Sequence, residues 1–355
     1  MSKLVILQTC APDYRKKFFD QITSTLGEDF ILMAGKNYFE PTVKTNYAGS
    51  SLKMVNNHFL LNRKILIQTG IWTQVFEATV MVMEMNPRII TNWIILLIRR
   101  LLRKQTVLWG HAWPRGGETS KSDWVRNVMR LFANQIIVYT NRQAEELKQK
   151  MPNKVIKAAP NAVMFSSEML AVSTLPNEVN DFIYVGRLTP SKNVRFLVDS
   201  FIEHQSKFNE KSRLLLVGDG EEMSGIKKII NQHFMRDRVI VFGHISDFEI
   251  LSKLYSTCIC SLSPGYIGLS VTQSFGMGVP MLISRNENHS PEIEAVKEGV
   301  NGEFFESGNS NNLINGMLSF LERKKYWLSQ KKSIAQSCRE NYSIENMASV
   351  FIKLI

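Results

Sequence analysis

At 355 residues the chain is longer than one hydrophobic core usually organises, so we expect two domains. Hydrophobic residues at 44% and charged residues at 21% are typical of a soluble globular protein, which excludes long disordered regions. The 43 Lys and Arg against 32 Asp and Glu leave a net charge of +11. This charge indicates an anionic partner without choosing among nucleic acid, anionic lipid and phosphorylated small molecules.

The first half of the chain alternates apolar runs of strand length with segments of helix length, as parallel βαβ units do. We predict buried strands at residues 4–7, 30–33, 88–91, 106–109 and 135–139. The first run is too short for the core of a signal peptide. No apolar run reaches the ~18 residues of a membrane-spanning helix, so any membrane contact is expected to be peripheral.

Residues 92–104 predict a helix with one apolar face and a basic end. The apolar residues at one-face spacing are Ile94, Leu97, Ile98 and Leu101. The cations of the last turns, which suit the helix dipole, are Arg99, Arg100, Arg103 and Lys104. The pattern fits a helix lying on an anionic bilayer, and it also fits a sheet-packing helix with a solvated basic end.

The second half repeats the alternation, with predicted strands at residues 182–185, 213–217, 239–242, 257–261 and 280–283. Residues 171–180 lack periodicity and contain Ser, Thr, Pro and Asn, as a linker does. We therefore expect an N-terminal domain at 1–170, a linker at 171–180 and a C-terminal domain at 181–340. Residues 341–355 are expected to form a helix that packs back on the first domain.

The four cysteines are Cys10, Cys258, Cys260 and Cys338. Their spacing matches neither a zinc site nor a disulfide framework, which favours a reducing compartment. Cys258 and Cys260 alternate within an apolar run, so we interpret them as core residues of a strand.

A phosphate-binding pattern follows the predicted strand at 182–185. Gly186 permits a sharp turn, and Arg187 and Lys192 come next, before a helix that should start after Asn193. Open α/β sheets bind ligands at the carboxyl ends of their strands, where helix N-termini also offer amides. Two cations and these amides are the groups that hold a diphosphate.

Gly186-Arg187-Leu188 followed by Lys192-Asn193 resembles the donor-phosphate motif of glycosyltransferase family four, the group 1 enzymes. Five further segments occur in the order of that family, and they lie at residues 160–163, 217–220, 241–245, 263–270 and 273–280. The resemblance implies an α/β protein of GT-B architecture, in which two Rossmann-like doubly wound domains face each other across a cleft.

The chain departs from the family at one pair of positions. The family usually carries two glutamates eight residues apart, the first near the donor sugar and the second on the ribose, and this chain has Gly265 and Gln273 there. Gln273 can still bind a ribose hydroxyl through its amide. By resemblance, the other donor-binding residues are Gly268, Leu269, Ser270 and Glu292.

In the N-terminal half, the resemblance implies that His111 faces the donor sugar, because it follows the strand at 106–109 as the family's cleft histidine does. Asp13 and Arg15 follow the first strand and are expected on the acceptor side. Asp13 equally fits a helix N-cap, and His111 equally fits a satisfied core histidine.

The chain contains no Asp-x-Asp pair, so cations and amides are expected to hold the diphosphate without an essential metal or cofactor. We predict a retaining glycosyltransferase that moves a sugar from a UDP- or GDP-linked donor to a hydroxyl of a glycan acceptor. The resemblance and the basic helix favour a lipid-linked acceptor of bacterial lipopolysaccharide O-antigen or capsule synthesis. The expected location is cytoplasmic, with peripheral contact at the inner face of the cytoplasmic membrane as one option. The sequence leaves the base, sugar, linkage and oligomeric state open.

Two other classes of protein fit the sequence less well. A nicotinamide-dependent oxidoreductase needs a glycine-rich fingerprint, and the nearest match, at residues 218–223, lacks its third glycine. A non-catalytic nucleic-acid-binding protein would suit the charge, but the basic residues are dispersed and no aromatic and basic recognition module appears. Nucleic acid is therefore not an expected partner.

Overall fold

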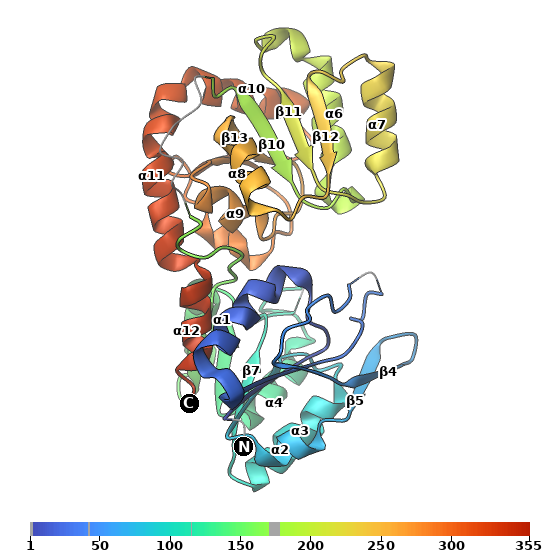
Figure 1. The fold of residues 1–355 in the computed structure, drawn as a ribbon, viewed down its shortest axis with the longest axis vertical. Helices are drawn as coiled ribbons and strands as arrows, with labels where there is room; N and C mark the ends of the chain where they lie inside the picture. Colours follow the sequence, from blue (N-terminus) through green and yellow to red (C-terminus); the bar gives the residue numbers. More distant parts are fainter. Residues whose placement is uncertain (1–2, 42, 115, 170–177) are drawn as a thin grey trace. The chain divides into compact units, whose positions relative to one another are not determined.

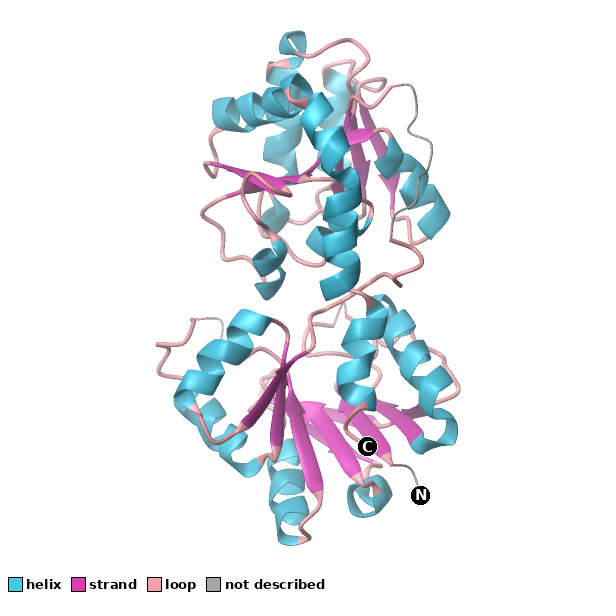
Figure 2. Cartoon of the chain, turned by 90° about the vertical axis from the view of Figure 1, so that its left-hand side faces the viewer, coloured by secondary structure: helices cyan, strands magenta, loops and turns pink. Residues whose placement is uncertain are grey.

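The computed structural model describes residues 3–41, 43–114, 116–169 and 178–355, so most of the expected linker, residues 171–177, lies outside the described residues. The chain divides into two compact units (Figures 1 and 2). Unit 1 consists of Met1–Val163 and Tyr342–Ile355, and unit 2 consists of Met164–Asn341. Each unit contains one parallel sheet with helices packed on it, which confirms the predicted α/β class.

Unit 1 contains a seven-stranded parallel sheet in the order β3-β2-β1-β6-β7-β8-β9. Its strands are β1 (Leu4–Gln8), β2 (Phe30–Ala34), β3 (Leu52–Met54), β6 (Val80–Glu84), β7 (Gln105–Trp109), β8 (Gln135–Val138) and β9 (Val155–Ala158). The strand order reverses between β1 and β6. The carboxyl ends of these two strands therefore lie where doubly wound sheets bind ligands.

One predicted strand, residues 88–91, is wrong. Ile89 forms only an isolated bridge to Leu66, and Ile90 is already the first residue of helix α3 (Ile90–Leu101). The strand at this place in the fold is β6, whose residues Val80–Met83 are fully buried. Short apolar runs of this kind do not distinguish a strand from the start of a helix.

The remaining elements of unit 1 cover its sheet or extend from it. The strands β4 (Asn56–Leu60) and β5 (Ile65–Thr69) form a separate antiparallel hairpin. The other helices are α1 (Lys16–Leu26), α2 (Trp72–Glu77), α4 (Asp123–Phe132), α5 (Asn141–Lys150) and α12 (Ile344–Ile352). Helix α12 packs on α1, and the ring of Phe351 lies 5.1 Å from Phe18 and 4.8 Å from Trp109. The last helix of the chain is therefore part of the core of unit 1.

Arg99 corrects the expectation of a solvated basic end on α3. Its side chain is fully buried, and its guanidinium donates to the carbonyls of Val75, Ala78, Thr79 and Gln105 and to Thr106 Oγ1. Burial lowers its pKa to about 10. A buried cation whose donors are used by backbone carbonyls ties α3 to the ends of α2 and β7, and it is not available to a membrane surface.

Unit 2 contains a six-stranded parallel sheet in the order β12-β11-β10-β13-β14-β15. Its strands are β10 (Asp181–Val185), β11 (Leu214–Val217), β12 (Val239–Gly243), β13 (Cys258–Ser263), β14 (Met281–Ser284) and β15 (Gly302–Phe305). Its helices are α6 (Val194–Glu203), α7 (Met223–Gln232), α8 (Phe248–Ser256), α9 (Ser270–Gly276), α10 (Ser310–Glu322) and α11 (Lys324–Asn341). All five strands predicted here are present within one or two residues.

The cysteines are free thiols in both units. Cys258 and Cys260 are buried in β13, which confirms their interpretation as core residues, and Cys10 and Cys338 are buried as well. Among the described residues, no helix is long and apolar enough to cross a membrane.

Candidate functional site

The loop after β10 makes close backbone contacts with the loop after β11. The chain turns at Gly186, makes a single 3-10 turn at Pro190–Lys192 and enters α6 at Val194. The loop after β11 packs directly on it, because Leu188 N donates to Asp219 O at 2.9 Å. A Cβ atom on Gly218 would lie 1.8 Å from Gly186 O, and one on Gly220 would lie 2.3 Å from Leu188 O. The two glycines thus let the loops touch backbone to backbone.

Lys192 is held at the carboxyl edge of the sheet. Its Nζ donates to Tyr266 O at 2.6 Å and lies 4.4 Å from the centre of the Tyr266 ring. Burial lowers the pKa of Lys192 to about 8, the positive charge of Arg187 adds to this effect, and the carboxylate of Glu292 opposes it. The structure therefore brings Arg187, Lys192 and Glu292 into one electrostatic neighbourhood, with Arg187 exposed and Glu292 buried.

Gly265, the residue at the family's first glutamate position, is enclosed by the same loop. Tyr266 N donates to Ser191 O at 3.0 Å, so the two loops are hydrogen-bonded at this point. A Cβ atom on Gly265 would lie 2.7 Å from Ser191 O and 2.9 Å from the carbonyl carbon of Lys192. Real side chains do not approach backbone this closely. The absence of a carboxylate at 265 is therefore built into the packing of this site.

Glu292 and two neighbours support the loop that contains Gly268. Ser290 Oγ donates to Glu292, and a Cβ on Gly268 would lie 3.8 Å from Ser290 Oγ. His289 Nδ1 accepts from Ile267 N at 3.2 Å, while its Nε2 lies 2.8 Å from Ser284 O. Burial lowers the pKa of His289, which favours the neutral ring that accepts through Nδ1. Sequence reasoning missed His289, because a single histidine outside a motif has no pattern.

The other donor-side residues lie on or before α9. Leu269 is the N-cap residue of this helix, Ser270 is its first residue, and Gln273 is half-buried one turn later. Gly186, Gly268, Leu269 and Ser270 all follow strands or precede helices of unit 2 at the carboxyl edge of its sheet. These residues thus belong to the same edge as Arg187 and Lys192.

In unit 1, Arg15 lies beneath the surface, while Asp13 is exposed. The guanidinium of Arg15 lies 4.3 Å over the Trp109 ring, and its Nη2 donates to Tyr139 OH at 3.2 Å. Asp13 is the first residue of a short 3-10 turn and its Oδ1 accepts from Tyr14 N. The two residues predicted for the acceptor side therefore differ in accessibility, because the Asp13 side chain is open to solvent and the Arg15 side chain is buried.

His111 follows β7 and is exposed. Its ring lies 4.7 Å from Tyr139 in an edge-on arrangement, and Arg126 Nη1 donates to its carbonyl at 2.7 Å. Because Tyr139 also binds Arg15, the structure brings His111 and Arg15 to one end of the sheet of unit 1.

A half-buried carboxylate that the sequence did not single out lies at the end of β6. Glu84 accepts from Thr9 N at 2.6 Å and from Thr9 Oγ1 at 2.9 Å. Burial raises the pKa of Glu84, and burial together with this carboxylate raises the pKa of Cys10 to about 12. An acidic residue that ends an otherwise apolar run was the signal available, and it was hidden because β6 was not predicted.

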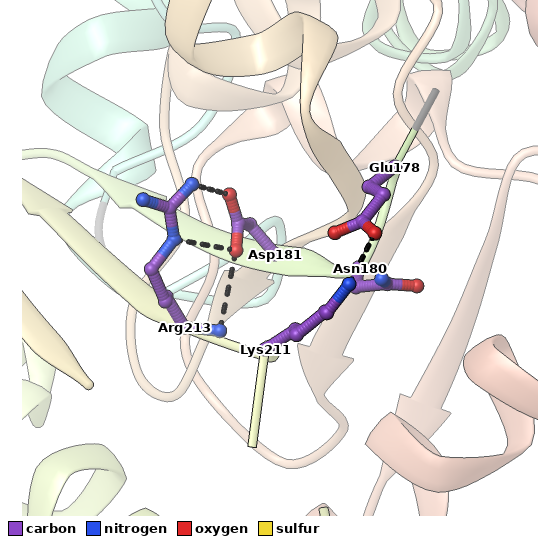
Figure 3. A pocket seen from close by; sticks show the side chains of 5 residues that line it. All are labelled: Glu178, Asn180, Asp181, Lys211 and Arg213. Atoms are coloured by element: carbon purple, nitrogen blue, oxygen red, sulfur yellow. Dashed lines mark hydrogen bonds and ion pairs between the residues drawn. The ribbon is translucent and has the colours of Figure 1, made fainter. Parts of the chain in front are cut away.

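A surface pocket of unit 2 lies at the opposite edge of its sheet (Figure 3). It is lined by Glu178, Asn180, Asp181, Lys211 and Arg213. Asp181 begins β10 and Arg213 immediately precedes β11, so the pocket lies at the amino ends of these parallel strands. Its charges are engaged with one another, since Arg213 Nη2 lies 2.6 Å from Asp181 and Lys211 Nζ lies 2.5 Å from Glu178. This pocket is separate from the Arg187 and Lys192 edge.

The comparisons with known proteins agree on the class of this fold. Residues 166–339 match the model of the family described as glycosyl transferases group 1. The chain is 28% identical over 149 residues to the UDP-N-acetylglucosamine--peptide N-acetylglucosaminyltransferase GtfA subunit of Streptococcus pneumoniae. That match covers 41% of this chain and 29% of the relative, so the matched segment spans less than a third of the relative's length.

Two solved structures cover the whole chain. The structure of Anabaena HepE in complex with UDP has a TM-score of 0.70 at 15% identity and covers 100% of this chain and 99% of its own. The apo form of the lipopolysaccharide outer core galactosyltransferase WaaB has a TM-score of 0.65 at 14% identity, with 100% of both chains covered. At these identities the likeness concerns the fold, and it confirms the predicted GT-B class with its two Rossmann-like units.

Proposed function

This chain belongs to the group 1 glycosyl transferases through residues 166–339, and from that premise we propose that it transfers a sugar from a nucleotide-diphosphate donor to a hydroxyl of a glycan. The observation that carries the proposal is the edge of unit 2 where Arg187 and Lys192 share one electrostatic neighbourhood. These residues match the family's donor-phosphate motif, and two cations so placed suit the two phosphoryl groups of a sugar nucleotide.

The chemistry we propose for this edge is stabilisation of the departing nucleotide diphosphate. As the bond from the anomeric carbon to the phosphate oxygen breaks, negative charge develops on the diphosphate. Arg187 and Lys192 are proposed to neutralise that charge, and preorganised electrostatics of this kind usually contributes most to the rate. We propose that the transfer needs no essential metal, because Arg187 and Lys192 would supply the positive charge.

Around the diphosphate, Gly186, Gly268, Leu269 and Ser270 are proposed to offer backbone groups. Gln273 is proposed to bind a ribose hydroxyl through its amide, and Glu292 to accept from a hydroxyl of the donor. The sugar side differs from the family pattern, since the enclosed Gly265 brings no carboxylate. We propose that this position helps decide which sugar is accepted, with UDP or GDP as the nucleotide.

We propose a retaining mechanism, in which the acceptor hydroxyl attacks from the face that the diphosphate leaves. His111 is proposed to support the charge that develops on the sugar, and a phosphate oxygen of the donor to receive the acceptor proton. Glu84 is a poor candidate for a nucleophile, because both of its oxygens accept hydrogen bonds from Thr9. Asp13 and Arg15 are proposed for the acceptor side.

For the acceptor we propose a lipid-linked glycan of bacterial lipopolysaccharide O-antigen or capsule synthesis, reached from the cytoplasmic side of the membrane. Peripheral contact of the protein with an anionic membrane would bring it to that acceptor. The resemblance to enzymes of surface polysaccharide synthesis and the basic character of the chain support this choice.

A thermal-shift screen with UDP, GDP, ADP and dTDP, each with and without a chelator, tests the donor. We expect stabilisation by UDP or GDP that survives chelation. Stabilisation by none of the four nucleotides, or loss of the shift with the chelator, would contradict the proposed site or its independence from metal. For the mechanism, a product whose anomeric configuration is inverted relative to the donor would exclude retention.

A further inference from the structure

The positive charge of the chain is confined to one of its two units. Unit 1 contains 24 Lys and Arg against 12 Asp and Glu, whereas unit 2 contains 19 against 20, and together they make the +11 of the whole chain. A diphosphate site in unit 2 does not explain an excess of +12 in unit 1. The excess indicates an anionic partner of unit 1 itself.

Helix α3 of unit 1 has two apolar faces instead of one. One face is in the core through Ile95, Leu96 and the buried Arg99. The second face is exposed, and its members recur every three or four residues: Ile90, Ile94, Leu97 and Leu101. Leu101 has 84% of its surface exposed. The solvent side of a surface helix normally carries charged and polar residues, whereas the solvent side of α3 is apolar.

Helices α2 and α4 extend this exposed face on either side of α3. Lys104, just after α3, donates to Phe76 O of α2, and Arg100 Nη1 donates to Leu131 O of α4 at 3.2 Å. Both helices expose apolar side chains at one-face spacing, namely Trp72 and Phe76 on α2 and Trp124 and Leu131 on α4. Figure 1 shows α2, α3 and α4 together on one side of the sheet of unit 1. We call the exposed residues of these three helices the α2–α3–α4 face.

Cations lie at the C-terminal end of α3 in the α2–α3–α4 face, and acids are scarce in the three helices. Arg100, Arg103 and Lys104 end or follow α3. The acidic residues of the three helices are Glu77 and Asp123, and Asp123 is buried in ion pairs with Arg130 and Lys150. Exposed aliphatic side chains, two tryptophans and a group of cations at one end are the composition that binds the interface of an anionic bilayer.

We propose that the α2–α3–α4 face docks unit 1 onto an anionic lipid bilayer, with Leu97, Leu101 and Trp124 entering the interface and Arg100, Arg103 and Lys104 meeting the lipid phosphates. This inference rests on the proposed function in one respect, since a lipid-linked acceptor gives the docking its use. It differs from the basic-helix expectation because the apolar side chains carry the contact and Arg99 takes no part. A second copy of the chain is a poorer occupant, because pairing this face with itself would bring together two units of charge +12 each.

Flotation of the full-length protein with phosphatidylcholine vesicles, with and without phosphatidylglycerol, tests the docking. Wild-type protein is expected to float with the anionic vesicles and to remain in solution with the neutral ones. Leu101→Gln and Trp124→Gln are each expected to weaken binding about tenfold, the size expected from losing the burial of one large apolar side chain. Arg103→Glu is expected to weaken binding to anionic vesicles through charge.

Leu61→Gln is the matched control, because Leu61 is 68% exposed in unit 1 but lies in the turn between β4 and β5. Equal effects of Leu61→Gln and Leu101→Gln, or no flotation of wild-type protein, would overturn the proposal. A wild-type dimer in light scattering that Leu101→Gln dissociates would assign the face to a second copy instead. UDP-induced thermal stabilisation, measured on the same samples, reports the donor site separately. Wild-type protein that is stabilised by UDP but does not float contradicts only the docking, and wild-type protein that floats but is not stabilised by UDP contradicts only the proposed function.

Discussion

Unit 1 and unit 2 share one architecture, but they differ in net charge and in how much of each is described by sequence motifs. Unit 2 is nearly neutral, and its loops are fixed by glycines that let backbone touch backbone at Gly218, Gly220 and Gly265. Unit 1 carries all of the net charge, and its exposed helix face, its buried Arg15 and its half-buried Glu84 belong to no motif. We propose that unit 2 binds the nucleotide diphosphate and that unit 1 meets the acceptor. The family match covers residues 166–339 of the chain, so the sequence pattern describes the proposed donor side better than the proposed acceptor side.

The sharpest test of this contrast removes the cations of unit 2. Arg187→Ala and Lys192→Ala are each expected to lower the turnover of the nucleotide sugar by ~10²–10³-fold, the size typical for removing one group that stabilises developing negative charge. The turnover is measured as the rate at which nucleotide is released when the donor is hydrolysed or its sugar is transferred. Arg195→Ala is the matched control, because Arg195 is an exposed cation on α6 that pairs with Asp199. A loss of similar size in Arg195→Ala would show that general charge, not the loop, supports turnover.

The second prediction concerns stability and separates the two units. Arg99→Met is expected to destabilise unit 1 by about 3 kcal/mol, because several buried carbonyls lose their charged donor. Urea unfolding followed by tryptophan fluorescence measures the loss. Arg100→Met, at an exposed position that binds one carbonyl, is the control and should change stability by ~0.5 kcal/mol or less. Stabilisation of unit 2 by UDP should persist in Arg99→Met, and its loss would mean that the units do not carry separate roles.

The third prediction concerns the missing glutamate. Gly265→Glu brings back the family's residue, yet we expect it to weaken UDP binding by about tenfold, because its Cβ would displace the backbone of Ser191 and Lys192. Gln273→Glu, which restores the second glutamate on α9, should leave UDP affinity within ~3-fold, since an amide and a carboxylate both accept from ribose. Calorimetric titration measures both variants. Tighter binding or faster turnover in Gly265→Glu would contradict the packing argument.

The smallest expected effect is a pH dependence of donor affinity that belongs to unit 2. Lys192 has a pKa of about 8 in the free protein, and its protonated form attracts the diphosphate. Raising the pH through 8 removes that charge, so affinity for UDP should be full below pH 7 and about tenfold weaker at pH 9. Lys192→Arg, which stays charged throughout this range, should abolish the decline. An identical decline in Lys192→Arg would assign the titration to another group.

The sequence predicted unit 2 more fully than unit 1, for physical reasons that particular residues show. In unit 2, the strands β10, β11, β13 and β14 are almost entirely buried apolar runs, and the cation pair follows β10, so periodicity and motif agreed. In unit 1, β6 was missed and the start of α3 was taken for a strand, since both are short apolar runs. Glu84, Tyr139 and His289 act through contacts between distant segments, which no local pattern encodes. The burial of Arg99 was hidden because a cation in the last turn of a helix is usually solvated.

The enclosure of Gly265 shows a second limit of sequence reasoning. The substitution itself was visible, but its meaning depended on where the loop that contains Ser191 and Lys192 lies. Only the close approach of the two loops shows that the glycine is required by packing and does not merely mark a lost carboxylate.

The most direct test of the central claim is a calorimetric titration of UDP and of uridine onto wild-type protein and onto Arg187→Ala and Lys192→Ala. The account predicts that wild-type protein binds UDP more tightly than uridine, and that each variant loses this advantage while its weak binding of uridine is unchanged. Equal affinity of wild-type protein for UDP and uridine, or UDP binding unaffected in both variants, would contradict the account.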